Sequence, residues 1–368
     1  MKIGVLTSSR ADYGIYLPLL EKLKTDSFFS LEIIAFGTHL SKKHGFTLSD
    51  IIKDRYNIVH EITSFSEDDS EKGIAMSYSN TILSFSDFWS DQKFDLVFCL
   101  GDRFEMSAAV QASIPFGVKL AHIHGGETTL GAIDNTYRHQ ITLASKYHFV
   151  SSNIHMKKVK QLTGSSNFIY NVGSLSLSNI ESFKPDDRSV FLKNFNINNV
   201  PYILVTFHPE TVSAKNNLVF AKIMKDALTI LCKKINLIIT MPNADTLGSV
   251  YRKELNKLKN SNPAKIFLVE NFGKVNYFNA MYHSELLLGN TSSGIIEAAS
   301  FNKYVINVGD RQKGRTHGTN VFNTGFDAVK IIEIFNDLMN KKDSKIDNIY
   351  FKKNTVRNII AILKTHTI

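Results

Sequence analysis

Short apolar runs alternate with helical patterns along the whole chain. Near-continuous apolar segments such as Asp95–Leu100 and Glu285–Leu288 are typical of parallel strands covered on both faces. The pattern predicts strands at Lys2–Thr7, Leu31–Phe36, Asp95–Leu100, Val118–Ile123, Tyr147–Ser151, Tyr202–Phe207, Leu237–Thr240, Ile266–Val269, Glu285–Leu288 and Tyr304–Val308. It predicts helices at Tyr16–Lys24, Ala75–Trp89, Glu105–Ile114, Tyr137–Ser145, Ile154–Leu162, Leu218–Lys233, Leu247–Leu258, Val275–Tyr282, Gly294–Ser300 and Ala328–Asn340. This alternation favours parallel sheets with right-handed crossovers, so we expect an α/β protein with two doubly wound, Rossmann-like domains.

A polar stretch between Gly173 and Pro201 separates the two sets of elements and predicts the domain boundary. We expect an N-terminal domain at residues 1–175 and a C-terminal domain at 176–349, with a tail of about 350–368 that could pack back on the first domain. Ligands of doubly wound folds bind outside the carboxyl ends of the strands. Two such domains facing each other would form one cleft, with the chemistry placed just after strands.

The composition is that of a soluble globular protein. The 368 residues are 43% hydrophobic and 21% charged, which excludes a disordered or fibrous chain. No apolar run is long enough to span a membrane, and Ile3–Leu6 is too short for a signal-peptide core, so we expect a cytoplasmic protein. Cys99 and Cys232 lie in apolar surroundings, which predicts buried thiols rather than a disulfide.

The net charge of +9 admits either a nucleic-acid partner or a phosphorylated small molecule. The basic residues cluster at Lys157–Lys160, Arg252–Lys259, Lys341–Lys345 and Lys352–Arg357. These clusters are typical of helix surfaces and a polar tail, and they lack the interleaved aromatic residues of single-strand binders. We therefore expect neither nucleic acid nor a membrane as partner.

Polar motifs follow the first strands. A turn after Lys2–Thr7 carries Arg10 and backbone N–H groups that could bind an anion, although no G-x-G-x-x-G fingerprint is present. Asp102 and Arg103 follow Asp95–Leu100. A charged pair at the tip of a buried strand is costly unless it is paired or used, and the alternative is that Asp102 caps the helix starting near Phe104.

The next strand ends in the sequence HIHGGE, which contains His122, His124 and Glu127, and Asp134, Arg138 and His139 come shortly after it. Two carboxylates with imidazoles nearby suit acid/base chemistry. The spacing matches neither H-E-x-x-H nor a cysteine-based site, so we expect no metal and no cofactor.

The second half repeats this arrangement, with polar residues that follow its strands: His208, Asn243, Asp245, Thr291, Ser292, Ser293, Arg311 and Arg315. Hydroxyls and N–H groups at a helix N-terminus, with Glu297 one turn further on, are typical of an anion site. The adjacent basic loop indicates a nucleoside diphosphate bound by the C-terminal domain.

In order along the chain stand SRADYG, LGDRFE, HIHGGE, D-x-x-x-R-H, FHPET, PNAD, GNTSSGIIE and GDRQKGR. Together, from residue 5 to about 318, they resemble the hydrolysing UDP-N-acetylglucosamine 2-epimerases of sialic-acid biosynthesis and their relatives of the legionaminic-acid pathway. The resemblance implies a glycosyltransferase-B-like fold and a homodimer or homotetramer. It also implies a reaction in which UDP-N-acetylglucosamine gives N-acetylmannosamine and UDP through a 2-acetamidoglucal.

The resemblance also implies roles for single residues. Asp102 and Asp134 match the catalytic carboxylates, with Glu127 nearby, and His208 would face the diphosphate. Residues expected to bind nucleotide and sugar are Arg10, Arg103, Arg138, His139, Asn243, Asp245, Thr291, Ser292, Ser293, Glu297, Arg311 and Arg315. Many members carry HIEGGE, so His124 stands where they have a catalytic Glu, and either its imidazole or Glu127 would move that proton.

Three alternatives remain open at this stage. The substrate could be UDP- or GDP-linked 2,4-diacetamido-2,4,6-trideoxyglucose. The enzyme could be a non-hydrolysing epimerase that returns the nucleotide sugar, or a glycosyltransferase of the same fold that requires an acceptor.

Overall fold

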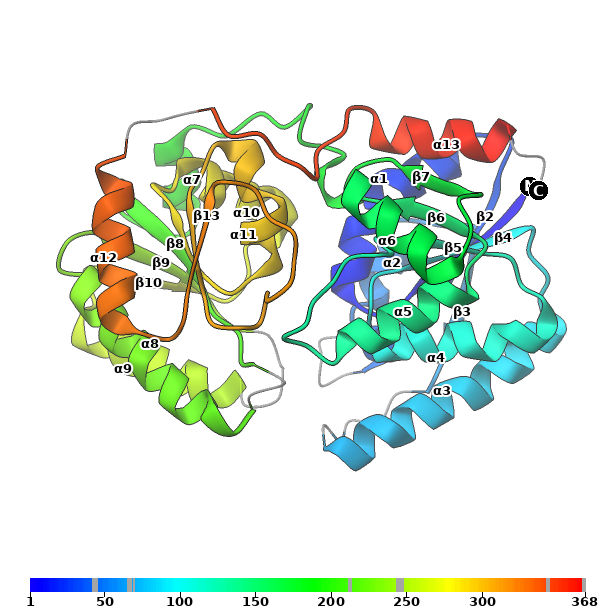
Figure 1. Ribbon diagram of the computed structural model, residues 1–368, viewed down its shortest axis with the longest axis horizontal. Coiled ribbons are helices and arrows are strands. Elements are labelled where there is room, and N and C mark those ends of the chain that lie inside the picture. The colour runs from blue at the N-terminus through cyan, green and yellow to red at the C-terminus, as the bar shows by residue number, and fades with distance from the viewer. Residues whose placement is uncertain are drawn as a thin grey trace. The chain divides into compact units, whose positions relative to one another are not determined.

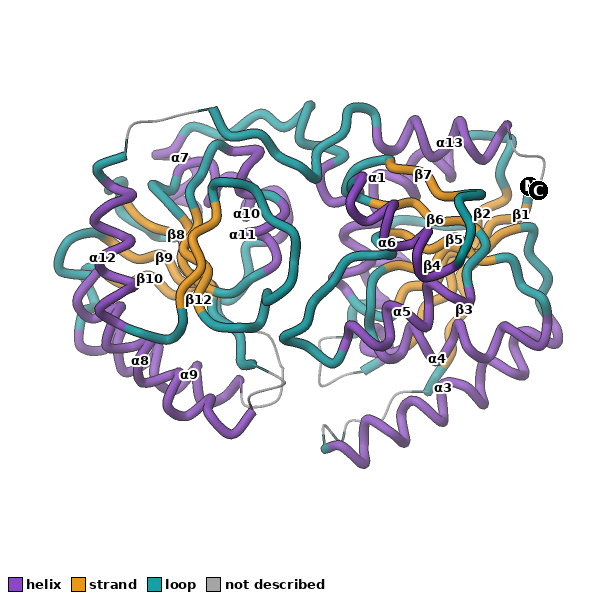
Figure 2. The backbone as a smooth tube through the Cα atoms, viewed as in Figure 1, coloured by secondary structure: helices purple, strands orange, loops and turns teal. Residues whose placement is uncertain are grey.

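The computed structural model describes residues 1–41, 46–64, 68, 70–210, 214–242, 248–341 and 345–365. The chain forms two compact units, the first from Met1–Glu127, Asp134–Glu181 and Tyr350–Ile368, the second from Thr128–Ile133 and Ser182–Ile349. Each unit consists of a parallel sheet with helices on its faces (Figure 1, Figure 2). Two doubly wound α/β domains were expected, and this fold class is confirmed.

The first unit has a parallel sheet with the strand order β3-β2-β1-β4-β5-β6-β7. Its strands are β1 (Lys2–Thr7), β2 (Ser30–Phe36), β3 (Ile58–Ile62), β4 (Leu96–Leu100), β5 (Leu120–Ile123), β6 (Tyr147–Val150) and β7 (Ile169–Asn171). The order reverses between β1 and β4, whose register pairs Ile3 with Leu96. Ligands of open α/β sheets bind at such a switch point.

Helices cover both faces of this sheet: α1 (Arg10–Thr25), α2 (Leu48–Lys53), α3 (Glu71–Asp91), α4 (Phe104–Ser113), α5 (Asp134–Ala144), α6 (Asn153–Thr163) and α13 (Thr355–Thr365). On one face, Leu19 of α1 and Ile359 of α13 share a core with Val5. On the other, Trp89 of α3 and Met106 of α4 pack with Val97. Figure 1 shows α1 and α13 above the sheet and α3 and α4 below it.

The second unit has a parallel sheet with the order β10-β9-β8-β11-β12-β13. Its strands are β8 (Tyr202–Thr206), β9 (Asn236–Thr240), β10 (Ile266–Val269), β11 (Leu287–Gly289), β12 (Val305–Val308) and β13 (Val321–Thr324). Its helices are α7 (Arg188–Asn194), α8 (Asn217–Leu231), α9 (Gly248–Ser261), α10 (Gly273–His283), α11 (Ser292–Ile296) and α12 (Ala328–Met339). Helices α8, α9 and α12 share one core with the strands, and the switch point lies between β8 and β11.

Several elements of the structure were not predicted from the sequence. The strands β3, β7 and β13 were not predicted because they lie at sheet edges, are short and carry polar or half-exposed residues. The short helices α2 and α7 were also missed. The interpretation of Lys352–Arg357 as part of a polar tail was wrong, because α13 begins at Thr355 and buries Ile359, Ile360 and Leu363.

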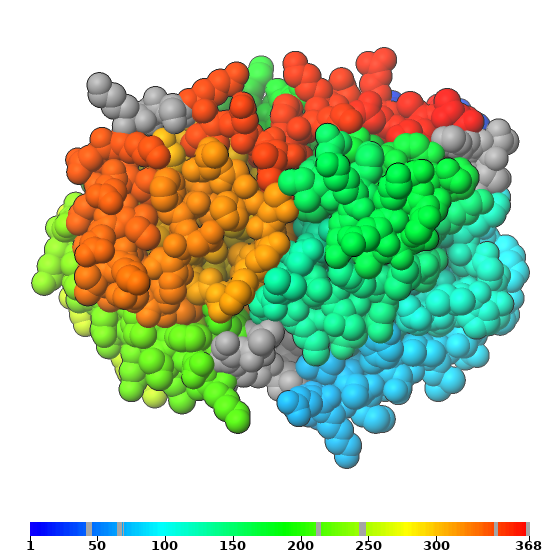
Figure 3. Space-filling view, in the orientation of Figure 1, coloured from blue at the N-terminus to red at the C-terminus, as the bar shows by residue number. Residues whose placement is uncertain are grey.

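The segment from Tyr350 to α13 is attached to the first unit by backbone as well as side chains. The N–H of Ser174 donates to the carbonyl of Tyr350 at 2.8 Å, and Lys352 Nζ donates to the carbonyl of Asn171 at 2.7 Å. Figure 3 shows this segment, in red, against the green residues that lead to β7. The C-terminal residues therefore complete the first unit.

Both cysteines are free and buried, as expected. Burial raises the pKa of the Cys99 thiol to about 12. None of the helices in the described ranges is long and apolar enough to cross a membrane.

Candidate active site

In the turn after β1, two backbone N–H groups are occupied by a side chain of the same turn. Asp12 accepts from the N–H of Ser8 at 2.8 Å and of Ser9 at 2.9 Å, within the capping box that starts α1. The N–H groups of Ser8 and Ser9 are therefore not available to the anion that was predicted to bind at this turn. Arg10, exposed in the first turn of α1, keeps its side chain in solvent.

Asp102 lies just beyond β4, after Gly101, whose φ of +79° is a conformation that favours glycine. It does not cap α4, because the N-cap is Arg103 and no side-chain capping bond forms there. Instead, Arg138 Nη2 of α5 donates to Asp102 Oδ2. The Arg138 side chain is 3% exposed and the Asp102 side chain 25% exposed, so a buried guanidinium holds a carboxylate that solvent still reaches.

Arg138 also connects Asp102 to the HIHGGE segment. Its Nη1 donates to the backbone carbonyl of Glu127 at 3.1 Å. The Glu127 side chain is buried, and Oε1 accepts from Ser151 Oγ at 2.9 Å, while Ser151 Oγ lies 2.9 Å from His155 Nδ1. Glu127 is therefore anchored on both its backbone and its carboxylate.

His124 adopts a positive φ of +65°, just after β5. Its Nε2 accepts the backbone N–H of Leu175 at 3.0 Å. A ring nitrogen that accepts a hydrogen bond carries no proton, so this ring is neutral and cannot act as an acid through Nε2.

Two further predicted residues lie on α5. Asp134 begins the helix, and its charge, after those of Glu105 and Asp12, raises the pKa of Arg103. Arg103 Nη2 itself donates to Glu105 Oε1 at 2.6 Å. His139 Nε2 is buried without a hydrogen-bond partner among the described residues, and burial lowers the pKa of His139.

The second unit brings three loops together after β8, β11 and β12. The N–H of His208 donates to Asn290 Oδ1 at 2.7 Å, and Asn290 Nδ2 donates back to the His208 carbonyl at 2.8 Å. Arg311 Nη1 donates to the Pro209 carbonyl at 2.5 Å, and Gln312 Nε2 to the Asn290 carbonyl at 3.0 Å. These bonds join all three loops at the switch point.

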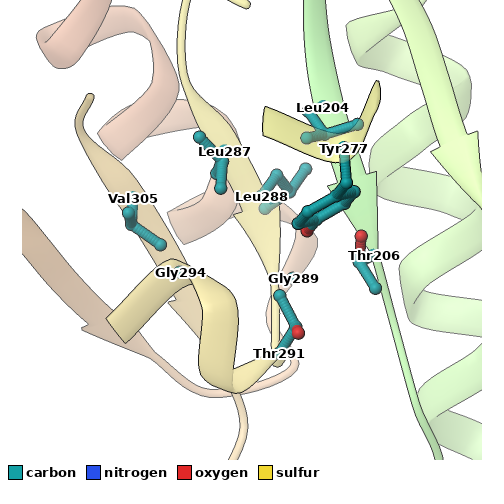
Figure 4. A pocket seen from close by; sticks show the side chains of 9 residues that line it. All are labelled: Leu204, Thr206, Tyr277, Leu287, Leu288, Gly289, Thr291, Gly294 and Val305. Carbon is teal, nitrogen blue, oxygen red and sulfur yellow. The ribbon is translucent and has the colours of Figure 1, made fainter. Parts of the chain in front are cut away.

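The expected hydroxyl residues lie within this arrangement. Thr291 is the N-cap of α11, with Oγ1 accepting from the N–H of Ser293 at 3.4 Å, and Ser292 is its first residue. Thr291 also lines a hollow of about 10 Å³ together with Thr206, Tyr277 and Gly289 (Figure 4). Glu297 follows α11 as its C-cap.

The loop Gly309–Arg315 borders a larger cavity of about 390 Å³. Arg315, one of its lining residues, donates from Nη2 to Thr129 Oγ1 at 3.2 Å. Thr129 belongs to the segment Thr128–Ile133, which lies between Glu127 and Asp134 in sequence but is part of the second unit. The predicted residues Asn243 and Asp245 lie outside the described residues.

Sequence analysis missed several residues at these loops. Asn290 and Gln312 were not singled out, although both stand in quoted motifs beside residues that were. Lys274 and Tyr277 of α10 were missed because they precede the strand end, and a lysine on a helix is usually solvent-exposed. Among the described residues, no cluster of three His, Cys, Asp or Glu side chains is arranged to hold a metal ion.

Comparison with known proteins gives a family match. The family model for UDP-N-acetylglucosamine 2-epimerase matches residues 21–364. The hydrolysing GDP/UDP-N,N'-diacetylbacillosamine 2-epimerase of Campylobacter jejuni is 35% identical, over 88% of this chain and 84% of that protein. The polysialic acid biosynthesis protein P7 of Escherichia coli is 32% identical, over 99% of this chain and 93% of that protein.

Two further proteins to which the chain is similar are also named as 2-epimerases. The hydrolysing UDP-N,N'-diacetylbacillosamine 2-epimerase of Legionella pneumophila is 30% identical, over 99% of this chain and 96% of that protein. The crystal structure of UDP-GlcNAc 2-epimerase from Neisseria meningitidis bound to UDP-GlcNAc superposes with a TM-score of 0.82 and 18% identity, covering 100% of both chains. This last similarity concerns the fold.

Proposed function

Because the chain belongs to the UDP-N-acetylglucosamine 2-epimerase family, we propose that it is a hydrolysing 2-epimerase acting on a nucleotide-linked 2-acetamido sugar. The observation that carries the proposal is the pair of Asp102 and Arg138 at the switch point of the first unit. A general base must be both positioned and accessible, and Asp102 is held by a buried guanidinium while remaining partly exposed.

The first half of the reaction is an elimination. Asp102 takes the proton from C2 of the sugar, the C2–H electron pair forms the C1=C2 bond, and the C1–O bond breaks with its electrons going to the diphosphate. Nucleoside diphosphate and a 2-acetamidoglucal result. His208, Arg311 and the Thr291–Ser293 segment, on the joined loops of the second unit, supply the polar groups assigned to the leaving diphosphate.

The second half is the addition of water. Hydroxide adds to C1 and a proton adds to C2 on the face opposite the one that lost it, so a free sugar with inverted C2 leaves. We assign Glu127 and Asp134 to these proton transfers, because Arg138 bonds both Asp102 and the backbone of Glu127, and Asp134 begins the helix that carries Arg138. One water is consumed for each nucleoside diphosphate released.

The favoured sugar is 2,4-diacetamido-2,4,6-trideoxyglucose, or N,N'-diacetylbacillosamine, linked to UDP or GDP. Two relatives at 35% and 30% identity are named for this substrate. UDP-N-acetylglucosamine, the substrate that the sequence motifs alone favoured, is the second candidate. A relative at 26% identity, from Neisseria meningitidis, is named UDP-N-acetylglucosamine 2-epimerase.

The test is incubation of the protein with each of the three nucleotide sugars while proton NMR follows the products. We expect free 2-epimerised sugar and nucleoside diphosphate in equal amounts, with the diacetamido substrates turned over at least about tenfold more efficiently. In D₂O the product should carry deuterium at C2. An epimerised nucleotide sugar without free diphosphate, or turnover only with an added acceptor, would overturn the proposal.

A further inference from the structure

Lys274 of α10 holds its ammonium group in an unusual place. Its Nζ is buried and has no hydrogen-bond partner among the described residues. An ammonium ion that loses water without gaining a partner costs several kcal/mol, so lysines are almost never buried unpaired. Burial lowers the pKa of Lys274, and the nearby charge of Glu297 acts in the opposite direction.

Tyr277 lies one turn further along α10, on the same face of the helix as Lys274. Its hydroxyl is buried beside the hydroxyls of Thr206 and Ser293, and the charge of Glu297 acts on it as well. Figure 4 shows Tyr277 reaching into the hollow that Thr206 and Thr291 also line. Helix α10 thus presents the hydroxyl of Tyr277 to the ends of β8 and β11, and the charge of Glu297 acts on both Tyr277 and Lys274.

The cations of the basic loop differ from Lys274 in their contacts. Arg311 donates to the carbonyl of Pro209, and Arg315 donates to Thr129 Oγ1. Both guanidinium groups therefore already hold the loops together, whereas no hydrogen bond joins the ammonium of Lys274 to any residue that the structure describes. A buried cation without a protein hydrogen-bond partner is expected where an anionic ligand binds.

We propose that Lys274 binds the nucleotide, with its ammonium group hydrogen-bonded to a phosphate of the nucleoside diphosphate. The inference rests on the proposed function and adds a residue to it. A phosphate oxygen would supply the missing hydrogen-bond acceptor and a negative charge in addition to that of Glu297. Tyr277, with its buried hydroxyl, lies one turn from Lys274 on the same face of α10.

The test is the variant Lys274→Met, which keeps the length of the side chain and removes its charge. Calorimetric titration would measure the affinities for UDP, UMP and uridine. Lys253→Met is the matched control, because Lys253 is exposed on α9 in the same unit. We expect Lys274→Met to bind UDP about ten- to a hundredfold more weakly, with uridine binding unchanged, and Lys253→Met to behave as wild type.

A thermal unfolding experiment without ligand completes the test. Replacing an unpaired buried charge with an apolar group should leave the melting temperature unchanged or raise it. A clear fall would show a structural partner for Lys274 and overturn the inference, as would unchanged UDP affinity or an equal loss for uridine. Wild-type protein that bound neither UDP nor GDP would instead contradict the proposed function.

Discussion

Arg138 donates a hydrogen bond to the carboxylate of Asp102, 36 residues earlier in the chain. Through its other terminal nitrogen it holds the backbone of Glu127. One buried guanidinium therefore fixes both a partly exposed carboxylate after β4 and the segment after β5. Such a link positions acid and base groups before the substrate arrives, which lowers the reorganisation needed during the reaction.

Asp102→Asn should abolish most of the activity. The amide keeps the shape of the side chain but cannot take a proton, so we expect kcat to fall about 10²- to 10⁴-fold. Release of nucleoside diphosphate measures this loss. Asp226→Asn is the control, because the Asp226 side chain on α8 is 65% exposed. An Asp102→Asn variant with a tenth or more of wild-type activity would remove Asp102 from the mechanism.

His124→Gln should be tolerated better than Glu127→Gln. His124 accepts the N–H of Leu175 through Nε2, and a glutamine oxygen can accept the same bond. We expect His124→Gln to stay within about tenfold of wild type and Glu127→Gln to lose about a hundredfold or more in kcat. The reverse order would assign the proton transfer to the imidazole. Melting temperatures of both variants control for misfolding.

Acid should destabilise the protein through His122. Burial lowers the pKa of His122 from 6.5 to about 3, and the neutral ring donates from Nε2 to the carbonyl of Gly101 at 2.9 Å. Above pH 6.5 both folded and unfolded forms are neutral. Below it only the unfolded form takes up the proton, so stability falls as pH falls towards 3.

The size of this effect follows from linkage. Between pH 7.5 and pH 5, His122 alone should lower the free energy of unfolding by about 2 kcal/mol. Denaturant titrations of wild type and His122→Gln at both pH values measure it, since the variant should lose about 2 kcal/mol less. Equal losses in the two proteins would mean that His122 is charged in the folded state.

Gly131→Ala should disturb the segment Thr128–Ile133. A Cβ at Gly131 would lie 1.8 Å from the carbonyl oxygen of Asp310, and the neighbouring Leu130 N–H donates to the Lys313 carbonyl at 2.8 Å. The segment must shift, at a cost of about 1–3 kcal/mol. Because Glu127 and Asp134 stand at its ends, we expect kcat to fall about tenfold or more.

Gly14→Ala provides the matched control for this prediction. Gly14 lies inside α1, and nothing stands within 4 Å of a Cβ added there. Alanine in a helix should stabilise the protein by about 0.5–1 kcal/mol without loss of activity. If Gly131→Ala and Gly14→Ala had the same kcat and the same stability, the close approach of Gly131 to Asp310 would not matter for activity.

Local patterns predicted what depends on local sequence. Buried strands such as β1 and β8 are continuous apolar runs, so both were predicted, and Asp102 and His208 were singled out because they follow strand ends. The partner of Asp102 was not found, because no periodicity links a strand end to Arg138 on a later helix. Likewise, no pattern indicates that Asp12 would accept from the N–H groups of Ser8 and Ser9, or that the ammonium of Lys274 would be buried without a hydrogen bond to any described residue.

Helix α13 has a consequence for how the protein is made. The core of the first unit contains Ile359, Ile360 and Leu363, which leave the ribosome after residues 182–349 of the second unit. Domains usually fold as they emerge, beginning at the N-terminus. Here residues 182–349 are complete before the first unit has its final helix. During translation, the first unit therefore receives α13 only after residues 182–349 of the second unit have been made, and the apolar surface that α13 will cover stays open until then.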